Sequence, residues 1–106
     1  MIKITFQTRN SEYKAVISEG HAEYAEAGED IVCSAVSILL INTANSIESF
    51  TDSFLGSDSD EGILTLVLKD TVDEKAKVLM DALKLGLETI QAEYGDDYLT
   101  IEYKEV

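Results

Sequence analysis

The sequence predicts an α+β fold, a two-layer sandwich with the element order β-β-α-β-α-β over residues 1–106. Three observations carry this prediction. The first residues alternate between apolar and polar side chains, two later segments have helical periodicity, and no linker is long enough to separate two domains. A four-stranded, mostly antiparallel sheet with two helices on one face is the economical way to bury these elements in a single domain.

The N-terminal segment predicts a β-hairpin. Ile2, Ile4 and Phe6 alternate with polar residues, which is typical of a strand with one buried face. Residues 9–12 form a short polar turn, and residues 13–18 form the second strand. This opening lacks the long apolar stretch of a secretory signal peptide.

The middle of the chain predicts one helix between two loops. Residues 19–29 have no periodicity and contain two glycines, so we expect an exposed loop. A helix begins at Asp30 and runs to about Ser49. Its stretch Ile31–Ile41 has nine apolar residues among eleven, which is too short to span a bilayer and typical of a buried core helix. Residues 51–62, rich in Ser, Asp and Gly, predict a second loop.

The remaining segments predict a strand, a long helix and a last strand. Residues 63–68 are an apolar run, expected to be a central strand. The helix over residues 72–94 begins with a capping box of Thr71 and Glu74 and stops at Gly95. The last strand covers residues 98–103. The sheet face away from the helices is expected either to be exposed to solvent or to be buried against a second copy of the chain. The apolar positions expected to face the core are Val72, Ala76, Leu79, Leu83, Leu87, Ile90, Leu99, Ile101 and Tyr103.

The negative net charge of the chain indicates which kinds of binding partner to expect. The chain has 21 acidic and 8 basic residues, for a net charge of −13. Nucleic-acid binding needs clustered basic side chains, and an anionic membrane surface repels such a protein, so neither partner is expected. A basic protein or peptide is the partner that this field attracts. The single cysteine, Cys33, excludes an internal disulfide and fits a reducing, cytoplasmic compartment.

One stretch joins the single histidine, His21, to the single cysteine. Asp30 is a candidate N-cap whose carboxylate would accept from the backbone N–H of Cys33. The cysteine would then lie in the first helical turn, where the helix dipole favours a nucleophilic thiolate. His21 would fold back as its base, which is the arrangement that acyl transfer to cysteine needs. The competing interpretation is an inert core cysteine and a solvated histidine.

A metal site is not expected. One His and one Cys fall short of the usual set of zinc ligands. Asp58, Asp60 and Glu61 resemble a calcium loop only loosely, because the loop lacks a glutamate at its twelfth position, so they are interpreted as a solvated loop. A thiol redox role is weakened by the lack of a second cysteine to resolve an oxidised form.

The stretch over residues 20–37 resembles the signature of the ribosomal-processing cysteine protease family (Prp). That signature is Gly-His-Ala, a short loop, Gly-x-Asp-Ile-Val-Cys and then small-small-Val-Ser, and here it is matched from Gly20-His21-Ala22 to Ser37. Ser34 stands where alanine is more usual in this pattern. The resemblance in length and opening strands extends over essentially the whole chain. It implies a cytoplasmic cysteine endopeptidase without a cofactor that removes the N-terminal extension of large-subunit ribosomal protein twenty-seven.

The resemblance also implies roles for single residues. Cys33 would be the nucleophile and His21 its general base, with backbone N–H groups at the helix start, including that of Cys33, as oxyanion donors. Asp30 would cap the helix or orient the imidazole, and Ser37 would line the site. Gly20 and Gly28 would be loop hinges or ordinary turn glycines. A homodimer is expected from the resemblance alone. The alternative function is a non-catalytic acidic binding module or chaperone for a basic ribosomal protein.

Overall fold

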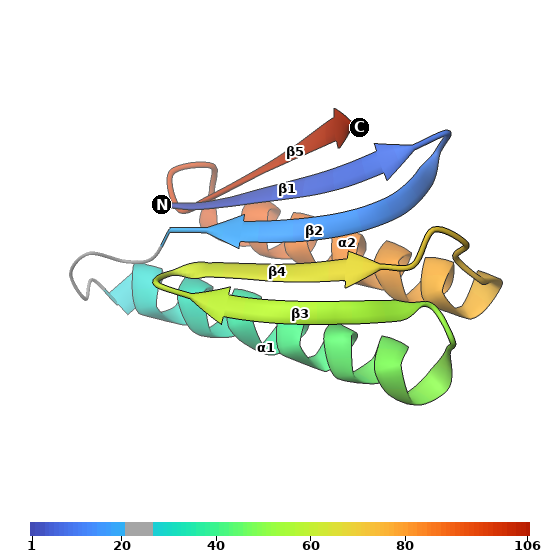
Figure 1. The fold of residues 1–106 in the computed structure, drawn as a ribbon. Coiled ribbons are helices and arrows are strands. Elements are labelled where there is room, and N and C mark those ends of the chain that lie inside the picture. Colours follow the sequence, from blue (N-terminus) through green and yellow to red (C-terminus); the bar gives the residue numbers. More distant parts are fainter. Residues whose placement is uncertain (21–26) are drawn as a thin grey trace.

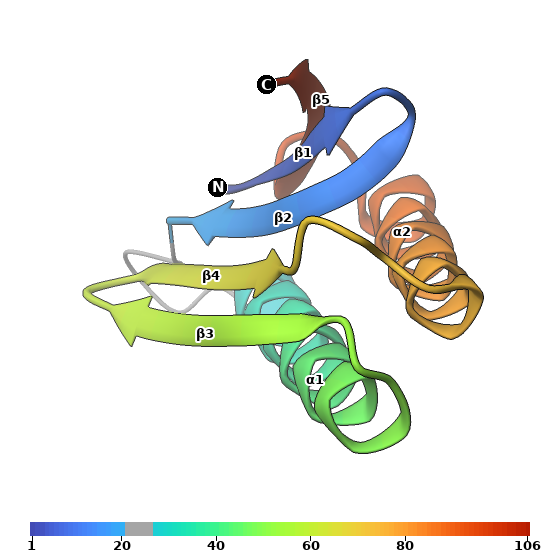
Figure 2. The ribbon, with the colours of Figure 1, turned by 45° about the vertical axis from the view of Figure 1, so that its right-hand side comes forward.

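The protein is a sandwich of one sheet and two helices (Figure 1). The computed structural model describes the backbone of residues 1–20 and 27–106 and the side chains of residues 1–20 and 31–106. Both helices cover the same face of a mixed sheet, whose strand order is β3-β4-β2-β1-β5 (Figure 2). In chain order the elements are β1 (Ile2–Arg9), β2 (Glu12–Glu19), α1 (Ala27–Phe50), β3 (Phe54–Asp60), β4 (Ile63–Leu68), α2 (Glu74–Tyr94) and β5 (Leu99–Glu105).

The sheet has five strands where the sequence predicts four. The additional strand, β3, lies within the segment expected to be a loop, and it pairs antiparallel with β4. The tight turn between them contains Glu61 and Gly62, both with positive φ, as hairpin turns require. Ser, Asp and Gly have low strand propensity, so cross-strand pairing with an apolar neighbour outweighs local preference here. The β1–β5 pair is parallel, which makes the sheet mixed.

Both helices begin elsewhere than predicted. Helix α1 begins at Ala27, three residues before Asp30. Helix α2 begins at Glu74, and its N-cap is Asp73, whose Oδ1 accepts from the backbone N–H of Ala76 at 2.8 Å. The predicted capping box is therefore wrong. Ser53 Oγ accepts from the backbone N–H of Asp73 at 2.9 Å, so a residue twenty positions earlier in the chain fixes this helix start.

The core lies between the helices and the sheet. Helix α1 contributes Val32, Val36, Leu40 and Ile47, each at most 2 % exposed. Its segment Ile31–Phe50 is long and apolar enough to cross a membrane by length and composition alone, so the apolar stretch is longer than predicted. These four buried side chains pack against the sheet, as expected for the core helix of a globular domain.

Helix α2 buries a stripe that differs slightly from the predicted one. Ala76, Leu83 and Leu87 are buried as expected, and Met80 joins them. The remaining predicted positions, Val72, Leu79 and Ile90, are partly buried at the edge of the core.

Strand β5 buries only its first half. Leu99 is fully buried, whereas Tyr103, predicted to face inward, is 50 % exposed and stacks on Phe6 with ring centroids 5.5 Å apart. Tyr13 lies on the other side of Phe6, and its hydroxyl donates to Asp81 Oδ1 at 2.6 Å. Burial and this carboxylate raise the pKa of Tyr13 above its ordinary value. These aromatic contacts join β1, β2 and β5 to α2.

Candidate active site

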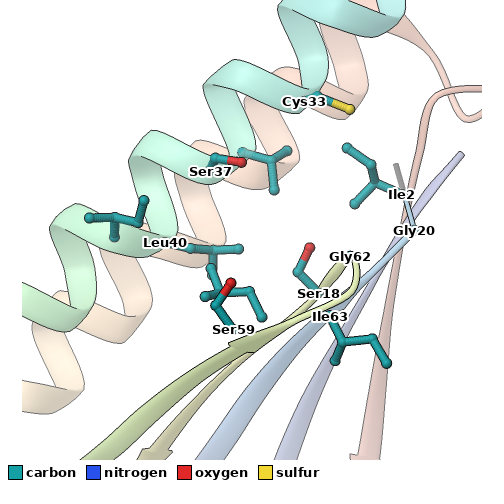
Figure 3. A pocket seen from close by; sticks show the side chains of 12 residues that line it. Ile2, Ser18, Gly20, Cys33, Ser37, Leu40, Ser59, Gly62 and Ile63 are labelled. Carbon is teal, nitrogen blue, oxygen red and sulfur yellow. The ribbon is translucent and has the colours of Figure 1, made fainter. Parts of the chain in front are cut away.

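A cavity of about 230 Å³ lies between α1 and the neighbouring ends of β2, β3 and β4 (Figure 3). It contains the predicted site residues Gly20, Cys33 and Ser37. Its walls are mainly apolar, and none of the described residues that line it is charged. The lining residues are Ile2, Ser18, Gly20, Cys33, Val36, Ser37, Leu40, Ile41, Ser59, Gly62, Ile63 and Leu64.

Cys33 is a partly buried residue on the wall of this cavity. Its sulfur points from α1 into the space above the sheet (Figure 3). Val32 and Val36, its neighbours on the helix, face the core and fix the rotation of α1. The helix thus places this thiol on the wall of the cavity rather than in the closed core.

The observed start of α1 changes the expected surroundings of Cys33. Cys33 is the seventh helical residue rather than a residue of the first turn. In a regular α-helix its N–H pairs with the carbonyl of residue 29, so it is not a free oxyanion donor in this structure. An N-cap has non-helical backbone, and Asp30 lies inside the helix, so Asp30 is not the cap. Gly28 likewise lies in the first helical turn rather than in a loop, and the side chains of both residues lie outside the described set.

Gly20 directly follows β2 and lines the cavity. Its φ is +94°, and a Cβ at this position would lie 2.3 Å from the carbonyl oxygen of Met1, so only glycine fits. Its N–H donates to the carbonyl of Gly62 at 3.1 Å, which ties the end of β2 to the β3–β4 turn. His21 is the next residue in the sequence, and it lies outside the described residues.

Ser37 lies one helical turn after Cys33 and is exposed. Its hydroxyl points toward the same cavity (Figure 3). Within the described part of the chain, no three His, Cys, Asp or Glu side chains are grouped closely enough to hold a metal ion. Asp58 and Asp60 belong to β3 rather than to a loop.

The residues that sequence reasoning missed are those that β-sheet pairing brings to the cavity. Ser18 comes from β2, Ser59 from β3 and Gly62 from the β3–β4 turn. Strand alternation predicts that Ser18 shares a face with Val16, which is a weak signal for a covered position. Sequence offers no signal for Ser59, because its strand was not predicted.

A family model describes the same chain. The model of the cysteine protease Prp matches residues 1–99. The chain belongs to the Prp cysteine protease family. A ribosomal processing cysteine protease Prp from Staphylococcus aureus is 32 % identical over 101 residues, covering 92 % of this chain and 94 % of that protein. The protein of the same name from Bacillus subtilis is 29 % identical over 106 residues, covering 92 % and 93 %.

Solved structures of similar proteins have the same fold. The S. aureus protease with a substrate peptide has a TM-score of 0.88 and 27 % identity, covering 98 % of this chain and 100 % of that one. The same protease with a covalently linked product peptide has a TM-score of 0.86 and 28 % identity, with the same coverage. A Streptococcus mutans protein has a TM-score of 0.84 and 31 % identity, covering 100 % of this chain and 96 % of that one.

Proposed function

We propose that this Prp family member is a cytoplasmic cysteine endopeptidase that removes the N-terminal extension of large-subunit ribosomal protein twenty-seven during ribosome assembly. The observation that carries the proposal is the position of Cys33, the single cysteine, on the wall of a mainly apolar cavity with its sulfur directed inward (Figure 3). The names of the relatives, which are ribosomal processing proteases, support the class of substrate.

In the proposed reaction the Cys33 thiolate attacks the scissile carbonyl carbon, and His21 first takes the thiol proton and then gives it to the leaving amine. The new amino terminus leaves, and water attacks the thioester, which releases the extension as a free acid and returns the proton to Cys33. Ser37 presents a hydroxyl to the cavity one turn from the nucleophile, where it is suited to donate to the substrate carbonyl oxygen. Asp30, one turn before Cys33, is proposed to orient the imidazole of His21 rather than to cap α1.

The shape of the surface suits an extended peptide. A second cavity of about 80 Å³ follows α1 from the first one and shares Leu40, Ile41 and Leu64 with it. Together they form a mainly apolar groove between α1 and the β3–β4 hairpin. Acidic side chains such as Asp58 and Asp60 stand exposed on that hairpin. Apolar residues of the substrate would occupy the groove, and basic residues of a ribosomal protein would meet the acidic hairpin.

Incubation of the protein with ribosomal protein twenty-seven carrying its extension tests the proposal. We expect release of one N-terminal fragment, located by mass spectrometry, and no cleavage by the His21→Ala variant. A substrate lacking the extension is the matched control and should stay intact. Binding of the extended protein without any cleavage, unchanged in His21→Ala, would instead support an acidic binding module.

We also propose that the protein is a homodimer. Large apolar side chains stand exposed on both helices. Among them, Ile31, Ile38, Val78 and Leu85 are each 50 % exposed or more. A second copy of the chain would remove them from water. Sedimentation equilibrium should give twice the chain mass of 11.7 kDa, and Ile38→Glu should shift the protein toward monomer. A single species of 11.7 kDa across micromolar concentrations would contradict the dimer.

A further inference from the structure

The two helices cover one face of the sheet, and no helix or strand of the described residues covers the other (Figure 2). On a sheet with one face in water, the outward side chains are usually polar. On the central strands β2 and β4 they are apolar instead. Ile17 and Val67 are half-buried without packing against the core, and Ile63 is 46 % exposed.

The strand register shows that these side chains form one patch. Leu66 of β4 is buried under the helices, so its immediate neighbours on that strand face the other way. Ile17 of β2 is paired with Thr65, and the next outward pair along the two strands is Ala15 with Val67. The outward side chains of β2 and β4 that lie together here are named the open-face patch: Ala15, Ile17, Ile63, Thr65 and Val67.

Acidic side chains border the open-face patch. Asp60 of β3 and Glu19 of β2 are both paired with Ile63, one from each side. Asp58 of β3 is paired with Thr65. All three carboxylates are exposed, and none takes part in a salt bridge within the described part of the chain. A partner that fits this surface brings apolar side chains to its centre and basic side chains to its border.

The open-face patch adjoins the candidate active site. Ile63 belongs to the patch and also lines the cavity that contains Cys33. Ribosomal proteins bind RNA phosphates through Lys and Arg, so the body of the proposed substrate supplies the basic side chains that the border needs. A second copy of this chain has a net charge of −13 and would bring further acidic side chains to an acidic border.

We propose that the open-face patch is a docking surface for the body of the ribosomal protein substrate, the part that remains after its extension is removed. The proposal rests on the proposed function for the identity of this partner. The cavity and groove would hold the residues around the cut, while the patch holds a part of the substrate outside them. Two linked contacts bind more tightly than either one alone, so the whole protein binds better than a short peptide that spans the cut.

Comparison of the whole ribosomal protein with such a short peptide tests this inference. Ile17→Lys puts a basic charge at the centre of the patch. We expect kcat/KM for the whole protein to fall about tenfold through a higher KM, with kcat unchanged, and cleavage of the peptide to stay as it was. Ile17→Thr keeps a β-branched side chain suited to a strand and should give a smaller loss of the same kind. Ala92→Lys adds the same charge at an exposed position of α2 and should change neither substrate.

Binding to the Cys33→Ala variant separates the docking surface from the protease function. If Ile17→Lys weakens binding of the whole protein there, while the active protein cleaves neither substrate, the docking surface stands and the proposed function is rejected. If the Ile17 variants cleave both substrates with equal changes or with none, the docking surface is overturned and the protease stands. A shift of Ile17→Lys from dimer to monomer with an unchanged substrate ratio would assign the patch to a second copy and overturn the inference. Failure of the whole protein to bind would reject both proposals.

Discussion

Cys33→Ala is expected to reduce cleavage of the extended ribosomal protein by roughly 10⁴-fold or more, because removal of the nucleophile of an acyl-transfer enzyme typically costs that much. The fold should survive the change. Cys33 is partly exposed on the cavity wall, and alanine is a better helix former than cysteine. Cleavage measured over days by mass spectrometry, beside thermal unfolding of the same sample, checks both expectations.

A displaced thiol gives the matched control. The double variant Cys33→Ala with Ser34→Cys keeps one cysteine but turns it about 100° around α1. Ser34 is exposed and does not line the cavity, so its thiol should react with alkylating reagents yet support no cleavage. Cleavage by this variant, or by Cys33→Ala alone, would show that the position of Cys33 is not what the chemistry needs.

Gly20→Ala is expected to destabilise the protein by roughly 2–4 kcal/mol and to reduce cleavage of the remaining folded fraction. The φ of +94° strains any L side chain, and the new Cβ would meet the Met1 carbonyl at 2.3 Å. Relief of this contact must move either β1 or the end of β2, from which the chain continues to His21. A domain of this size has about 5–15 kcal/mol of stability, so the loss is large but not necessarily complete. Urea unfolding and cleavage rates per folded molecule measure the two effects.

Gly56→Ala is the control for that variant. A Cβ at Gly56 has nothing within 4 Å, and its backbone is not in the left-handed region, so the unfolding free energy should change little. If Gly20→Ala and Gly56→Ala lowered the unfolding free energy equally, the contact with Met1 would not be the cause of the destabilisation at position 20.

Local sequence patterns were sufficient to predict those helices and strands that bury one face of their own side chains in the core. The hairpin of β1 and β2, the strand β4 at residues 63–68 and the long helix α2 follow from apolar periodicity, and the structure confirms them. The motif from Gly20 to Ser37 identified the family and singled out Cys33, because the chain's single cysteine stands at the cysteine position of the motif. His21 stays a prediction, since it lies outside the described residues.

Cross-strand and long-range contacts decided the rest. Strand β3 forms because an apolar neighbour, β4, offers its backbone edge to a segment whose own composition favours a loop. The start of α2 depends on a hydrogen bond from Ser53, a residue far away in the sequence. Helix α1 begins three residues before Asp30, and no local sequence rule distinguishes that start from the predicted one. The sequence by itself determined the periodic elements and predicted Cys33 as the nucleophile, because both depend on residue identity and spacing. Only the tertiary structure decided that Ser18 faces the cavity, because burial depends on the neighbours that the sheet assembles.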